Sequence, residues 1–150
     1  MSKTIRSATV SDIAEICQLI EPFIDEFAIN ESGRQLFTAQ MIQKMVENPE
    51  IHYLVYIDQE KIVGVIAYKQ PAHMVHFFIS RLYQGQGIGR ILWDFVLKQV
   101  QSENIFTFTV NSSCQAQGVY EKFGFSKSAD VIENHGLRYV PMSLNIARTT

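Results

Sequence analysis

The stretch RLYQGQGIGRILW, Arg81 to Trp93, constrains the fold of this chain more than any other. It follows the strand-like run HMVHFFIS and opens a segment with helical periodicity. Gly85, Gly87 and Gly89 stand within five positions, and glycine loses much conformational entropy unless the main chain must approach something closely. A helix start offers unpaired N–H groups and partial positive charge, which suit an anion. The stretch therefore predicts a strand-to-helix turn that holds a phosphate.

The glycine spacing excludes two common phosphate-binding loops. A dinucleotide fingerprint, G-x-G-x-x-G, would need its third glycine at position 90 or 92, where the chain has Arg90 and Leu92. A Walker-type loop would need Gly-Lys-Ser/Thr where the chain has Gly89-Arg90-Ile91. The stretch is therefore neither a dinucleotide-binding loop nor a Walker-type loop.

Hydrophobic periodicity along the chain predicts an α/β fold of layers around a mixed sheet. Strands are expected at 4–8, 51–57, 61–69, 73–80 and 105–110, with a last hairpin over 129–146. Helices are expected at 9–20, 39–47, 88–100 and 114–125, and residues 24–34 are expected to form an irregular acidic connector.

The surviving pattern, Gln84-x-x-Gly87-x-Gly89, resembles the acyl-CoA pyrophosphate loop of the GNAT superfamily of N-acetyltransferases. The resemblance covers the whole chain: IRSATVSDIAEI, KIVGVIAY and VNSSCQAQGVYEKFGF are similar to further family segments in the right order. The tail ENHGLRYVPM is most similar to a bacterial branch of small acetyltransferases without an assigned acceptor. The resemblance implies one GNAT domain over residues 1–150, with about seven strands, about four helices, and a sheet splayed between its fourth and fifth strands.

The same resemblance implies acetyl-CoA as cosubstrate. Backbone N–H groups from Gln84 to Arg90 would hold the pyrophosphate, the strand before them would pair with pantetheine, and the Asn111 amide would contact CoA. The implied cofactor-binding residues are Phe77, Phe78, Ile79, Gln84, Gly85, Gln86, Gly87, Ile88, Gly89, Arg90, Asn111 and Tyr120.

The implied reaction moves an acetyl group to a primary amine, on a small molecule or a peptide, by direct attack in a ternary complex. Tyr120 matches the tyrosine with which many relatives protonate the CoA thiolate, and a phenol with a pKa of about 10 stays protonated at neutral pH. The alternative for Tyr120 is a packing role. The alternative for the protein is a non-catalytic acyl-CoA-binding regulatory module.

His73 is the candidate base, since it stands eleven residues before Gln84, where the histone-acetylating branch carries its glutamate. Strand alternation predicts that His73 shares a face with Val75, Phe77 and Ile79, and that His76 packs on the opposite face. Water is one alternative base. Carboxylates of the acidic connector are another, and they could also attract a cationic amine: Glu21, Asp25, Glu26 and Glu31.

Composition sets the remaining expectations. The net charge is −2 and the thirteen Lys and Arg residues are scattered, so no nucleic-acid partner is expected. No apolar run reaches the length of a membrane span. Cys17 and Cys114 lack metal-ligand spacing, so we expect no metal and a cytoplasmic location. A homodimer is compatible with the resemblance.

Overall fold

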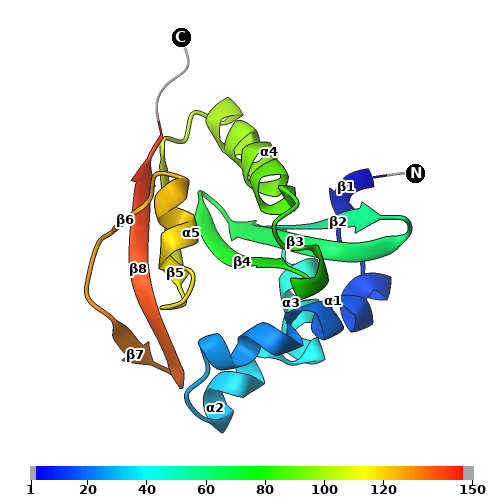
Figure 1. Cartoon of the computed structure of the whole chain (residues 1–150), viewed down its shortest axis with the longest axis horizontal. Helices are drawn as coiled ribbons and strands as arrows, with labels where there is room; N and C mark the ends of the chain where they lie inside the picture. Colours follow the sequence, from blue (N-terminus) through cyan, green and yellow to red (C-terminus); the bar gives the residue numbers. More distant parts are fainter. Residues whose placement is uncertain (1–2, 147–150) are drawn as a thin grey trace.

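The computed structural model describes residues 3–146, which form an eight-stranded sheet with helices on both faces (Figure 1). The strand order is β1-β2-β3-β4-β5-β8-β6, with β7 paired to β8 off this path. The strands are β1 (Lys3–Ser7), β2 (Ile51–Asp58), β3 (Lys61–Lys69), β4 (His73–Ile79), β5 (Thr107–Ser112), β6 (Ser126–Lys127), β7 (Ile132–Asn134) and β8 (Leu137–Asn145). The α/β fold with a mixed sheet is confirmed.

Five α-helices and four short 3₁₀ helices lie within the same residues. The α-helices are α1 (Ile13–Ile20), α2 (Glu31–Arg34), α3 (Ala39–Glu47), α4 (Ile88–Ser102) and α5 (Gln117–Lys122). The 3₁₀ helices are η1 (Val10–Asp12), η2 (Glu21–Glu26), η3 (Gln35–Phe37) and η4 (Arg81–Tyr83).

The splay of the sheet lies where it was expected, between β4 and β5. These strands run parallel and pair only at His73 with Thr109 and at Met74 with Val110, whereas the other neighbouring strands run antiparallel. Figure 1 shows β4 curving away from β5 after this short contact. Beyond it, the backbone of β4 pairs with β3 on one side and leaves its other edge open. An open strand edge presents unpaired amide groups to a ligand.

Two hydrophobic clusters fill the layers on either side of the sheet. On one face α4 buries Leu92, Trp93 and Val96 against the sheet. On the other face α1 buries Ile16 and Ile20, two members of its periodic apolar stripe. The N-terminal helical segment starts as 3₁₀ and becomes α-helical at residue 13, within the predicted 9–20 range.

The acidic connector is more ordered than the sequence pattern indicates. Residues 24–34 contain the end of η2 and the one-turn helix α2, which is capped by Asn30 through an Oδ1 contact of 3.1 Å from the Gly33 N–H. Single turns are too short to show hydrophobic periodicity, so the sequence pattern missed them. The two-residue strand β6 was missed for the same reason.

The predicted alternation along β4 is wrong. The pairing of β3 with β4 shifts by one residue in this region, so that Val75 is bulged. Val75 and His76 both face the α1 and α3 side, whereas Phe77 and Ile79 pack toward α4. Because of the bulge, His73 and His76 lie on the same side of the sheet, whereas regular alternation predicted opposite faces.

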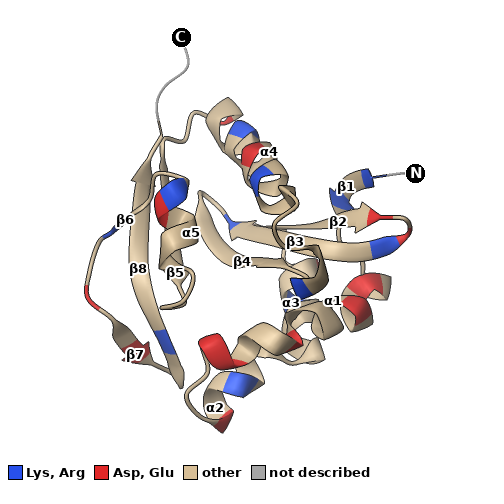
Figure 2. Ribbon diagram, viewed as in Figure 1, with Lys and Arg blue, Asp and Glu red and all other residues tan. Residues whose placement is uncertain are grey.

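No helix within residues 3–146 is long and apolar enough to cross a membrane. Figure 2 shows Lys and Arg dispersed among Asp and Glu over the helices and strand ends. This distribution agrees with the scattered charge of the sequence.

Candidate active site

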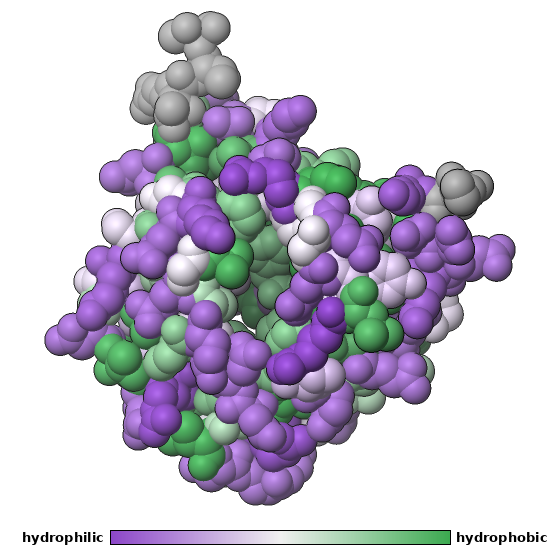
Figure 3. Space-filling view, in the orientation of Figure 1, coloured by the Kyte–Doolittle hydropathy of each residue, from purple (hydrophilic) through white to green (hydrophobic). Residues whose placement is uncertain are grey.

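The larger of two adjoining cavities, of about 440 Å³, lies where β4 and β5 diverge. Figure 3 shows it as a hollow with a hydrophobic floor between more hydrophilic rims. Two of the predicted cofactor residues, Gln86 and Arg90, are not among the residues that line it. The predicted residues that do line it are Phe77, Phe78, Ile79, Gln84, Gly85, Gly87, Ile88, Gly89, Asn111 and Tyr120.

The glycine turn forms one end of this cavity. Gly85 and Gly87 have φ angles of 81° and 84°, in the left-handed region that side chains rarely adopt, and a Cβ at either would project into open space. Gly89 differs: a Cβ there would meet the Phe77 ring at 3.7 Å, an ordinary contact. The backbone conformation therefore favours glycine at positions 85 and 87.

The N-terminus of α4 opens at the same place. Gly87 is the N-cap, and its carbonyl accepts from the Ile91 N–H at 3.1 Å as the first turn closes. The N–H groups of Ile88, Gly89 and Arg90 precede that bond and have no acceptor within the helix. They form, with the positive end of the helix dipole, a ready anion site.

Arg90 is committed to other contacts. Its guanidinium lies 4.8 Å from the centre of the Phe123 ring, and its Nη1 is 4.0 Å from Asp94 Oδ1. The side chain therefore links α4 to the end of α5, and its backbone N–H belongs to the turn.

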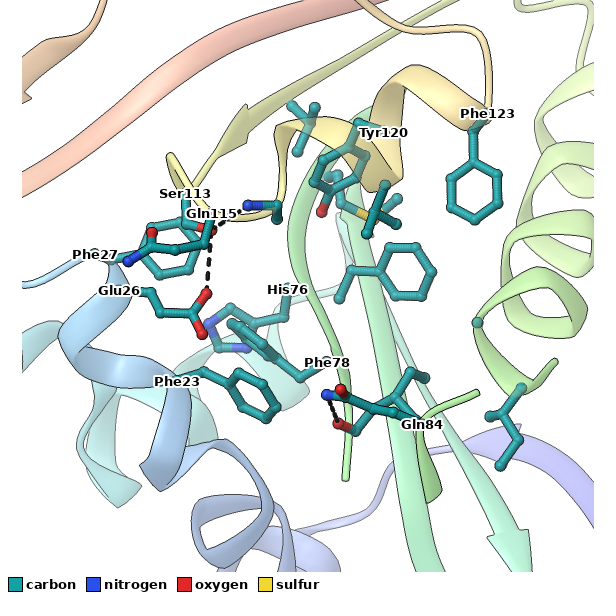
Figure 4. Close-up of a pocket in the computed structure, with 18 of the residues that line it drawn as sticks. Phe23, Glu26, Phe27, His76, Phe78, Gln84, Ser113, Gln115, Tyr120 and Phe123 are labelled. Atoms are coloured by element: carbon teal, nitrogen blue, oxygen red, sulfur yellow. Dashed lines mark hydrogen bonds between the residues drawn. The ribbon is translucent and has the colours of Figure 1, made fainter. Parts of the chain in front are cut away.

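The end of β4 is fixed by Gln84, whose Nε2 donates to the Ile79 carbonyl at 3.1 Å (Figure 4). This bond joins the strand to the glycine turn that follows. The position of the glycine turn relative to the open edge of β4 is therefore fixed.

Tyr120, from α5, points its hydroxyl into the cavity (Figure 4). The residue is only 7% exposed, and its ring packs edge-on against Phe77 and Phe125. Burial raises the pKa of the phenol, so it is protonated at neutral pH. Its hydroxyl makes no hydrogen bond to another residue of the described chain. Tyr120 thus presents a free proton donor to whatever occupies the cavity.

Of the four carboxylates predicted near the acceptor entrance, Glu26 alone lines the cavity. Its Oε1 accepts from the Ser113 hydroxyl at 3.2 Å (Figure 4), and its Oε2 lies 3.6 Å from Arg81 Nη2. The other three have partners on the surface: Glu21 and Asp25 with Arg34, and Glu31 with Gln35.

A second, smaller cavity of about 220 Å³ adjoins the first on the α1 and α3 side of the sheet. His73 lines the smaller cavity and not the larger one. The residues that line both are Phe27, Met74, Val75, His76, Phe78 and Asn111. The two cavities therefore meet at the gap between β4 and β5.

His73 is half-buried, and its Nδ1 lies 2.7 Å from Thr109 Oγ1. Burial, and then the charge of Lys69, lower the pKa of the imidazole below its usual value. The ring is therefore neutral at pH 7. In the tautomer whose Nδ1–H donates to Thr109, Nε2 carries a lone pair that can accept a proton.

His76 is a core residue. Its Nδ1 lies 2.8 Å from the Tyr53 hydroxyl, its ring stacks on Phe37, and burial lowers its pKa to about 4. These contacts agree with the packing role expected for it.

Sequence reasoning missed the aromatic side of the larger cavity. Phe23 and Phe27 come from η2 and its end, and their rings lie 5.3 Å and 6.2 Å from that of Phe78. Their four-residue spacing is the one signal that could have placed them on a shared face. Within residues 3–146, no cluster of three or more His, Cys, Asp or Glu side chains is arranged to hold a metal ion.

The split of the sheet thus forms a cavity that has the N-terminus of α4 at one end and the Tyr120 phenol within it. A sequence model of the acetyltransferase (GNAT) domain matches residues 24–146. The chain therefore belongs to the GNAT family of acetyltransferases.

Solved structures of N-acetyltransferases share the fold. PaiA N-acetyltransferase from Thermoplasma acidophilum, solved in complex with coenzyme A, matches with a TM-score of 0.76 and 15% identity over 97% of this chain and 99% of its own. The ribosomal-protein-S18-alanine N-acetyltransferase from Escherichia coli matches at 0.75 and 15% over 99% and 97%. Ard1 from Thermoplasma volcanium matches at 0.78 and 17% over 99% and 100%.

Proposed function

We propose that the protein transfers an acetyl group from acetyl-CoA to a primary amine by direct attack in a ternary complex. The observation that carries the proposal is the single cavity that the glycine turn, the open edge of β4 and the Tyr120 hydroxyl share. An anion site, an amide-pairing edge and a proton donor are what a CoA thioester needs along its length.

The chain fits CoA in two respects. The left-handed Gly85 and Gly87 leave open space in front of the α4 N-terminus, where the N–H groups of Ile88, Gly89 and Arg90 can bind the pyrophosphate. The unpaired edge of β4 can hydrogen-bond the pantetheine amides as a neighbouring strand would. When bound, the cosubstrate supplies an acetyl group on a thioester.

The reaction forms a C–N bond and breaks a C–S bond. The neutral amine attacks the thioester carbonyl, and the tetrahedral intermediate collapses with loss of the CoA thiolate. Tyr120 donates a proton to the sulfur, so that CoA leaves as a thiol. The amine nitrogen loses one proton to a base. The base then releases this proton to solvent, and solvent reprotonates Tyr120.

His73 is the proposed base. It stands on the smaller cavity, which meets the larger one at the split, and its lowered pKa keeps it unprotonated at neutral pH. Glu26 is the alternative, because it lines the larger cavity from η2.

Calorimetry with CoA, followed by mass spectrometry of an amine panel incubated with acetyl-CoA, tests the proposal. Tight CoA binding together with an acetylated amine supports it. CoA binding without acetylation of any amine would leave the regulatory acyl-CoA-binding module. Failure to bind CoA would contradict both functions.

A further inference from the structure

We propose that the smaller cavity is the acceptor site and that it selects a monoamine with an apolar carbon skeleton. The proposal rests on the acetyltransferase function proposed above and names its substrate class. The amine would lie at the junction of the two cavities, with the rest of the molecule extending away from the CoA side.

The smaller cavity has an apolar wall. Apart from the residues shared with the larger cavity, its lining has two polar side chains, His73 and Tyr139, among four aliphatic or aromatic ones. These residues are Leu36, Phe37, Met45, His73, Leu137 and Tyr139. Such a wall favours hydrocarbon over charged or hydroxylated groups.

Charge sharpens this selection. Among the residues that line either cavity, Glu26 is the only Asp, Glu, Lys or Arg. Its carboxylate already contacts Ser113 and Arg81. A second ammonium group on the acceptor would therefore enter the smaller cavity without a counter-charge, and an unpaired buried charge is strongly unfavourable.

The far wall of the smaller cavity is held in place by two backbone hydrogen bonds between the α2 region and the β7–β8 turn. Ile29 N–H donates to the Gly136 carbonyl at 2.8 Å, and Arg138 N–H donates to the Phe27 carbonyl at 2.7 Å. The contact is so close that a Cβ on Gly33 would overlap the Gly136 carbonyl. This contact holds Phe27 and Leu137, which line the smaller cavity of about 220 Å³, in fixed positions.

Acetylation of an amine panel by the wild-type enzyme tests the selection. We expect kcat/KM for phenethylamine and hexylamine to exceed that for spermidine, kanamycin and a lysine-containing peptide by about 100-fold, the scale at which a pocket rejects an unpaired polar group. Equal or higher kcat/KM for any of the polycationic acceptors overturns this inference and leaves the proposed function intact. Acetyl-CoA binding without transfer to any amine overturns both.

A charge introduced into the smaller cavity gives a second test. Met45→Glu, on α3, places a carboxylate in the lining, so it should lower kcat/KM for phenethylamine about 10-fold and narrow the preference over spermidine. Met41→Glu, on the same helix but outside both cavities, should leave the preference unchanged. An unchanged preference in folded Met45→Glu, with wild-type KM for acetyl-CoA, contradicts the assignment. If that variant does not fold, the wild-type panel decides.

Discussion

His73 and Thr109 are joined twice, since they are backbone partners in the short β4–β5 pairing and their side chains lie 2.7 Å apart, Nδ1 to Oγ1. The pair stands beside the point at which the sheet splits. The threonine hydroxyl therefore orients the imidazole of the proposed base.

The pH profile of kcat/KM tests this base. Because the pKa of His73 is lowered, we expect kcat/KM to rise with pH along a limb whose apparent pKa is below 6.5. A second rise, at higher pH, follows the pKa of the amine substrate. His73→Ala should remove the limb, and Thr109→Val should shift it with little change in KM for acetyl-CoA.

His52→Ala is the matched control, since His52 stacks on Tyr68 and lies outside both cavities. If the His73→Ala enzyme keeps the wild-type pH profile, the general base is water or Glu26 instead. His76 is unsuitable as a control, because it lines both cavities and shares the face of His73.

Replacing the phenol of Tyr120 tests the proton donor. Tyr120→Phe removes the hydroxyl and keeps the packed ring, so kcat should fall about 100-fold with unchanged CoA affinity by calorimetry. Tyr68→Phe, another buried tyrosine whose hydroxyl bonds Gln99 outside the cavities, should keep wild-type turnover. Wild-type kcat in Tyr120→Phe, with chemistry rate-limiting, would return this residue to a packing role.

The glycine turn is tested through CoA binding. Gly87→Glu should abolish binding, because it combines a left-handed backbone with an anion in the space meant for the pyrophosphate. Gly118→Glu, at an open position of α5 outside the cavities, should bind CoA normally. Unchanged affinity in a folded Gly87→Glu variant would contradict the assignment of the turn.

Acid sensitivity should depend on Asp12, which accepts two bonds from Arg6, at 2.7 and 3.0 Å, and one from the Thr9 N–H. The hydrogen bond from Arg6 has the largest effect on the pKa of this carboxyl, and the bond from the Thr9 N–H adds to it. The pKa is lowered to about 2. A lowered folded-state pKa stabilises the fold above the unfolded pKa of about 4, and this contribution disappears as the pH falls from about 4 to 2.

Asp12→Asn should therefore reduce the free energy of unfolding by about 1–2 kcal/mol at pH 7, after allowance for the exposure of Arg6. Urea unfolding at pH 7 and pH 3 measures this, and the difference from wild type should shrink at pH 3. Asp130→Asn, with a fully exposed carboxylate, should match wild type at both values. A difference that persists unchanged at low pH would exclude the ionised pair as its source.

The sequence by itself determined the features that depend on local conformation. A strand-to-helix turn at Gly85 and Gly87, a helix start behind them, and the position of Tyr120 within a short helix follow from residues next to one another in the chain. The strand and helix order follows for the same reason, since periodicity is a property of each segment alone.

The tertiary structure decided which of these groups meet. Glu26 reaches Ser113 across 87 positions of chain, and Phe23 and Phe27 join the cavity through packing on Phe78 of β4. The bulge at Val75, which sets the face of His73, arises from pairing with β3 and leaves no mark in the alternation of β4 itself. Beside the smaller cavity, Gly33 and Gly136 allow two backbone segments that are distant in the chain to touch. Contacts between distant segments depend on register and packing, which a local pattern does not encode.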